Sequence, residues 1–221
     1  MRKPVLAMWC LIACVVARGS AADDGMAAAA RRVSAAQARI HAGFRACAGQ
    51  LRAEGLDPRF LQSIWDAERF DVFEGVRLSL ARHAGRGPAY RAGTPPFKAS
   101  REACGRLAEA DARDQPGIAG VADSDLQAMR NAFATSHPDP HSIRDRNLHT
   151  DCMKVNFDTH DVDYASSVRL CDCTLDAMHA VPDDELDSWL ELAHSGVDVP
   201  MAEQAWYGIF VDRLWACSRT L

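Results

Sequence analysis

The sequence predicts an all-α protein, a helical bundle held together by disulfide bonds. Along most of the chain, apolar residues recur at spacings of three and four, which is the period of one helix face. Proline, glycine and capping residues interrupt this pattern where helix ends are expected. No stretch of useful length alternates apolar and polar residues as a half-buried strand does. We therefore expect helices throughout.

Residues 1–22 have the features of a signal peptide. A positively charged start precedes an apolar run over residues 5–17, and small residues follow it. We expect cleavage after Ala22, because the apolar run is too short for a transmembrane helix. The stretch Leu11–Cys14 also resembles a lipobox, in which Cys14 would carry a lipid anchor. Ordinary cleavage is favoured, since the apolar run continues past Cys14.

The first half of the mature chain is expected to hold four helices after a flexible entry at residues 22–30. Asp57 should cap the second helix and Asp71 the third, because a carboxylate can accept hydrogen bonds from free N–H groups of the first turn. The loop at 85–97 follows, rich in Gly and Pro. The apolar stripes place the four helices at about 33–51, 58–65, 72–80 and 100–112.

The second half is expected to hold five helices. Asp123 should cap the first, and Ser142 with Asp145 matches a capping box for the next. Asp161 is a suitable cap for the third, and Gly196 a suitable stop for the fourth. The stripes place these helices at about 124–133, 143–155, 164–180, 182–193 and 200–221.

Six cysteines remain for pairing after either kind of processing. An even number in an exported chain predicts three disulfides. Cys171 and Cys173 lie on one helix, where two residues span about 200° of rotation, so they should bond to different neighbours on opposite sides. The six are Cys47, Cys104, Cys152, Cys171, Cys173 and Cys217.

An internal duplication is suggested by laying residues 44–65 on residues 168–189. Six of these 22 positions are identical, including a cysteine, a proline and a tryptophan. The alignment predicts two related helical halves, at 23–117 and 118–221. If the halves are equivalent, the expected bonds are Cys47–Cys104, Cys171–Cys217 and Cys152–Cys173. The alternative keeps the first bond and exchanges the others, giving Cys152–Cys171 and Cys173–Cys217.

Two groups of residues are candidates for sites. The loop at 85–97 carries Arg86, Tyr90 and Arg91, and Tyr and Arg are frequent in binding hot spots. Four histidines lie among aspartates within 24 residues, which suggests a metal site, although no metal-binding motif is present and a solvated polar loop is the favoured interpretation. These histidines are His137, His141, His149 and His160.

The charge of the chain limits the class of partner. Its formal net charge of −5 becomes −8 when the three basic residues of the leader are removed. An acidic protein is a poor ligand for nucleic acid or anionic membranes and is compatible with a basic protein partner. We find no cofactor motif and no catalytic motif.

These observations favour a non-enzymatic, exported protein, periplasmic or secreted, that binds another protein. Its small size and acidity suit an inhibitor or an immunity-type protein of the cell envelope. Two alternatives stay open. One is an envelope hydrolase that uses scattered acids or histidines. The other is a metal-binding protein that uses the region from His137 to His160.

Overall fold

The computed structural model describes residues 4–83, 97–109, 117–159 and 162–219. These residues form helices and contain no strand, which confirms the predicted all-α class. Three disulfides hold the helices together, as expected. The chain divides into two compact units, unit 1 over residues 1–138 and unit 2 over residues 139–221.

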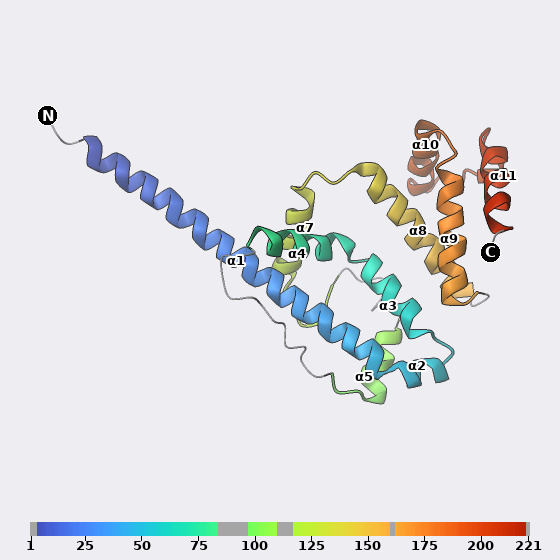
Figure 1. Ribbon diagram of the computed structural model, residues 1–221, viewed down its shortest axis with the longest axis horizontal. Helices are drawn as coiled ribbons and strands as arrows, with labels where there is room; N and C mark the ends of the chain where they lie inside the picture. Colours follow the sequence, from blue (N-terminus) through green and yellow to red (C-terminus); the bar gives the residue numbers. More distant parts are fainter. Residues whose placement is uncertain (1–3, 84–96, 110–116, 160–161, 220–221) are drawn as a thin grey trace. The chain divides into compact units, whose positions relative to one another are not determined.

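Unit 1 is organised around its first helix. Helices α4 and α7 pack against each other, and both pack against α1 (Figure 1). The short helices α2 and α5 contact each other and are joined by the Cys47–Cys104 bond. The helices of unit 1 are α1 (Pro4–Ala46), α2 (Ala48–Ala53), α3 (Pro58–Ala67), α4 (Phe70–Arg82), α5 (Arg101–Ala108) and α7 (Asp123–Ala134).

The contact between α4 and α7 is unusually close. A Cβ atom added at Gly75 would overlap the backbone carbonyl of Met129. Because only glycine permits this approach, Met129 and Val72 become fully buried between the helices. This packing assigns α7 to unit 1, so the observed division follows residue 138, whereas the sequence suggested residue 117.

The expectation of a flexible entry at residues 22–30 was wrong. Helix α1 runs through this stretch without interruption, and three of its alanines are buried. The helix stops at Cys47, before the predicted end near residue 51, and α2 begins there. The small alanine side chains in this stretch let the helix pack closely, and they do not indicate a flexible segment. Processing after residue 22 stays a prediction.

Helix caps agree with the sequence only in part. Asp57 caps α3 as predicted, and its carboxylate accepts from the amide of residue 59 at 2.8 Å. Asp71 lies inside the first turn of α4 and does not cap it. Asp139, not Ser142, caps α8, and Asp163 caps α9. The proposed cap Asp161 lies outside the described residues.

Unit 2 is built around α9, which packs against α8 and α11 (Figure 1). Its helices are α8 (Pro140–Thr159), α9 (Tyr164–Met178), α10 (Asp183–His194), the short 3₁₀ helix η1 (Met201–Glu203) and α11 (Tyr207–Ser218). The α10 helix ends before Gly196, whose φ of +79° suits glycine at a helix stop. The core of unit 2 is a small cluster of Ala177, Met178, Val181, Leu186, Trp206 and Phe210.

The disulfides confirm one predicted bond and correct the other two. Cys47 bonds to Cys104 as expected. The preferred pairs Cys171–Cys217 and Cys152–Cys173 were wrong. The structure has the alternative pairs, Cys152–Cys171 and Cys173–Cys217, with Cα atoms 5.7 and 5.6 Å apart. Cys171 and Cys173 point to opposite sides of α9, as expected. Cys171 faces α8, however, so it does not form the bond to Cys217 that a duplication of the first half predicts. The relation between the halves stays a prediction.

Substituting Gly75→Ala should destabilise unit 1 by about 2–4 kcal/mol, because the added methyl group forces α4 and α7 apart. Urea unfolding of the mature protein would measure this. Gly105→Ala in α5 is the matched control, since a Cβ there meets nothing within 4 Å. The control should be neutral or slightly stabilising, because alanine is the better helix former. Equal effects at both positions would contradict the close approach.

Replacing Cys173 and Cys217 together with serine should cost about 2–4 kcal/mol, because their bond closes a loop with a sequence separation of 44 residues. The matched variant replaces Cys152 and Cys171, whose separation is 19 residues, and it should cost less. Thermal unfolding of each oxidised variant measures the difference. Peptide mapping of unreduced protein checks the pairing, and a Cys171–Cys217 peptide would refute it.

Candidate functional site

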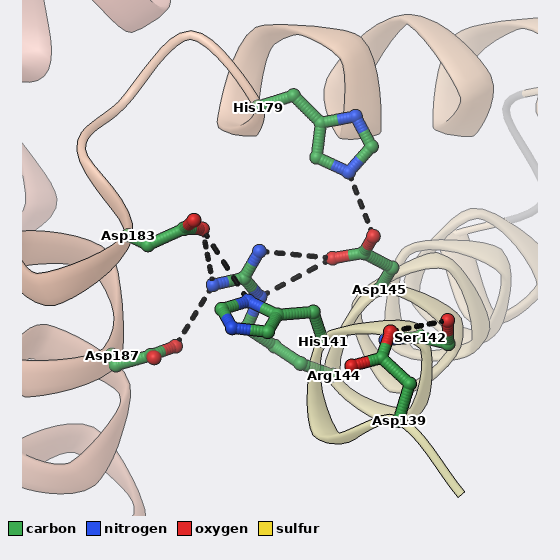
Figure 2. Close-up of polar contacts among 8 residues, drawn as sticks. All are labelled: Asp139, His141, Ser142, Arg144, Asp145, His179, Asp183 and Asp187. Atoms are coloured by element: carbon green, nitrogen blue, oxygen red, sulfur yellow. Dashed lines mark hydrogen bonds and ion pairs between the residues drawn. The ribbon is translucent and has the colours of Figure 1, made fainter.

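The densest polar network of unit 2 joins three helices around Arg144 of α8 (Figure 2). Its Nη1 donates to Asp183 at 2.8 Å and to Asp187 at 2.9 Å, both in the first turns of α10. Its Nε and Nη2 donate to Asp145 at 3.2 Å. His179, at the end of α9, places Nε2 2.8 Å from the other oxygen of Asp145.

The electrostatics of this network favour the charged forms of Arg144 and Asp183. Burial acts to lower the pKa of Arg144, whose side chain is 11% exposed, but hydrogen bonds to Asp187, Asp183 and Asp145 outweigh it and raise that pKa. The same hydrogen bond from Arg144 lowers the pKa of Asp183. A carboxylate with a lowered pKa is a weak base, so the network suits clamping α8, α9 and α10 together better than proton transfer.

A second set of hydrogen bonds holds the N-terminus of α8, beside the Arg144 network. Asp139 accepts from the amide of Ser142 at 3.1 Å and from its hydroxyl at 2.8 Å (Figure 2). These hydrogen bonds lower the pKa of Asp139. They satisfy free N–H groups of the first turn and so hold α8 at its N-terminus.

A groove opens in unit 2 between α8, α9 and α10, and we call it the unit-2 groove. Its volume is about 500 Å³, within the range of ligand pockets. Trp189 Nε1 donates to the carbonyl of Val199 at 2.9 Å, which holds the chain after α10 against the groove. The groove is lined by Leu148, His149, Asp151, Cys152, Val155, Cys171, Thr174, Leu175, Met178, Trp189, Leu190, Ala193, His194 and Met201.

The chemistry of the unit-2 groove is mainly apolar. The Cys152–Cys171 disulfide forms part of its wall, and Asn156 Nδ2 donates to the sulfur of Cys171 at 3.4 Å. Val155 lies at its edge with 62% of its surface exposed. No lysine or arginine is found among the described residues that line it.

Exposed apolar side chains gather in the same unit. Among the residues whose side-chain exposure the structure describes, which begin at residue 24, the exposed large apolar residues lie in unit 2. Single exposed apolar residues are ordinary, but one of these, Val155, lines the apolar groove, which indicates an interaction surface there. These residues are Val155, Leu192, Val197, Ile209 and Trp215.

Unit 1 has a larger cavity of about 720 Å³ beside Trp65 and Arg69. Arg69 is 1% exposed, and its guanidinium carbon lies 4.6 Å from the centre of the Trp65 ring. It donates to the carbonyls of Gly117 and Trp65 at 3.0 and 3.1 Å. Arg39 donates to the carbonyl of Ala119 at 2.7 Å. Both arginines thus hold the segment at 117–120 against α1 and α3.

The structure describes three of the four candidate histidines and does not bring these three together. His141 and His149 lie on α8 and face different aspartates, at 3.6 Å from Asp183 and at 3.3 Å from Asp172. His137 lies in the turn after α7 with a φ of +52°, and His160 lies outside the described residues. Within the described residues no group of three or more potential ligands is placed to hold a metal.

The loop candidates Arg86, Tyr90 and Arg91 lie outside the described residues, so their binding role stays a prediction. Helical periodicity alone does not reveal the unit-2 groove, which is lined in part by Leu148, Leu175 and Trp189. Their spacing is the same for a buried stripe and for a groove wall. The concentration of acidic residues after residue 139 was a signal that could have directed attention to this unit.

Substituting Arg144→Met should destabilise unit 2 by about 1–2 kcal/mol, because three carboxylates lose their shared cation while solvent screens the exposed ones. Urea unfolding with hydrogen exchange of α8 and α10 measures this loss. Arg213→Met is the matched control, since its pair with Asp176 is more than half exposed on both sides. Its removal should cost about 0–1 kcal/mol.

The effect of Arg144→Met should depend on pH. The pKa of folded Asp183 lies below its ordinary value of 3.8, so its contribution is complete above that pH and is lost as the pH falls below it. The difference between wild type and variant should therefore shrink as the pH falls from about 4 through the lowered pKa of Asp183. A difference that stays constant over this range would show that the arginine acts through packing alone.

None of the helices in the described residues combines the length and apolar character that crossing a membrane requires. Comparison of the chain with protein-family models, with curated proteins and with solved structures finds no match.

Proposed function

We propose that this protein is exported and acts by binding another protein through unit 2, without catalysing a reaction. The observation that carries the proposal is the apolar unit-2 groove with the exposed Val155 at its edge, in a unit that exposes four further large apolar side chains. An apolar surface of this kind costs free energy in water unless a partner covers it. An inhibitor or an immunity-type protein of the cell envelope fits this mode of action.

Export is supported by the disulfides and by the leader. All six cysteines outside residues 1–22 are paired in three bonds, and such bonds persist in oxidising compartments such as the periplasm. The signal-peptide features of residues 1–22 agree with this. A periplasmic or secreted location follows, with a lipid anchor at Cys14 as the less favoured form.

The rigidity of unit 2 also supports a binding role. Two disulfides, the Arg144 network and the hydrogen bond from Trp189 hold the groove walls in place. A binding surface that is ordered before it meets its partner loses less conformational entropy on association. The Arg144 network is best understood as part of this scaffold.

The test is capture of a partner from the envelope fraction of the source organism, with the oxidised mature protein as bait. We expect one dominant protein at fixed stoichiometry. Two variants locate the surface: Val155→Ser at the groove, and Ile209→Ser with Trp215→Ser on α11. Capture should be lost in at least one of them, because each removes exposed apolar area.

Reduced and alkylated bait is the control for folding, and it should retain nothing. Capture that survives both unit-2 variants, or the absence of any partner in repeated preparations, would contradict the proposal. Substrate screens would then test the hydrolase alternative.

A further inference from the structure

We infer that the unit-2 groove accepts a basic, amphipathic helical segment of a protein partner. This inference rests on the proposed function and specifies the chemistry of the partner. It combines two independent observations, the apolar groove and the distribution of charge between the two units.

The lining of the groove suits an amphipathic helix. Its walls come from three helices, and its apolar lining includes Leu148, Leu175, Trp189 and Leu190. An amphipathic helix places apolar side chains at spacings of three and four, which fits a groove between helices. Met178 and Met201 add side chains that adapt to different shapes. The exposed Val155 extends the apolar surface beyond the groove edge.

The net charge of unit 2 indicates which charged residues the partner helix should carry on the face that points away from the groove. Residues 139–221 contain sixteen Asp and Glu against six Lys and Arg, a net charge of −10. Residues 1–138 contain nineteen basic and fourteen acidic residues, a net charge of +5. The acidic excess therefore belongs to unit 2 alone, and it attracts a cationic partner and repels an anionic one.

The acidic side chains are at the surface, where a partner meets them. In the described part of unit 2 every Asp and Glu is exposed except Asp145, which is half-buried in the Arg144 network. Arg144 is engaged by three aspartates of this unit, and Arg213 by Asp176. The described lining of the groove in this acidic unit contains Asp151 and no lysine or arginine.

A second copy of this chain is a poorer occupant. Two copies would bring two units of charge −10 together, and like charges oppose such contact. A partner helix with lysine or arginine on its outer face instead gains from the same field. The field also speeds association at low salt.

The experiment uses the full mature, oxidised chain and an 18-residue synthetic helix of leucine and lysine, with leucine on one face. Calorimetry should show 1:1 binding. The same peptide with glutamate in place of lysine should bind at least about tenfold more weakly, because the charge is reversed. A peptide of shuffled order should also bind weakly, since its leucines no longer share a face. Affinity should fall as salt rises, because salt screens the attraction.

Matched variants place the peptide in the groove. Val155→Ser should weaken binding about fivefold or more, and Ile209→Ser should leave it unchanged. Both remove an exposed β-branched residue, of 62% and 52% exposure, but only Val155 lines the groove. Hydrogen exchange should show protection of α8, α9 and α10 on peptide binding.

Other outcomes overturn the inference in distinguishable ways. Equal binding of the glutamate peptide, or equal loss in both variants, rejects a basic helix in the groove. Self-association that Val155→Ser abolishes assigns the groove to a second copy. Partner capture that depends on Val155 while no lysine peptide binds rejects the inference and leaves the proposed function standing. Loss of both rejects both.

Discussion

The fixed geometry of one helix, α9, is the constraint on which unit 2 depends. Two residues along a helix are separated by about 200° of rotation, so Cys171 and Cys173 must bond on opposite sides. One bond holds α8 and the other holds α11. The apolar core of this unit is a small cluster, and units with small cores commonly need covalent support. The bonds supply that support without requiring more buried apolar residues.

The unit-2 groove is a consequence of this arrangement. Disulfides fix α8 and α11 against α9, whereas α10 is held by its packing and by the carboxylates that Arg144 binds. The space between α8, α9 and α10 is therefore kept open by charge and covalent bonds rather than filled by side chains. Val155 lies at the edge of this groove and is 62% exposed, so it is available to contact a partner.

The acidic residues of unit 2 repel one another, and the Arg144 network offsets part of this repulsion. A net charge of −10 on 83 residues favours solubility but repels itself in the folded state. Arg144 relieves this repulsion where Asp183 and Asp187 begin α10, and negative charge at a helix N-terminus is itself favourable. The remaining acids stay at the surface, and there they set the charge that a partner must carry.

The sequence by itself determined the helical class, the participation of all six cysteines outside residues 1–22 in disulfides, the opposite directions of Cys171 and Cys173, and local signals such as the Asp57 cap. These depend on residues close in sequence or on cysteine chemistry. Tertiary structure alone decided that Cys152 meets Cys171, that Gly75 lets α7 join unit 1, and that Leu175 and Trp189 line a groove. Each depends on which helices pack together, and a helical stripe gives the buried face of a helix without naming what covers it.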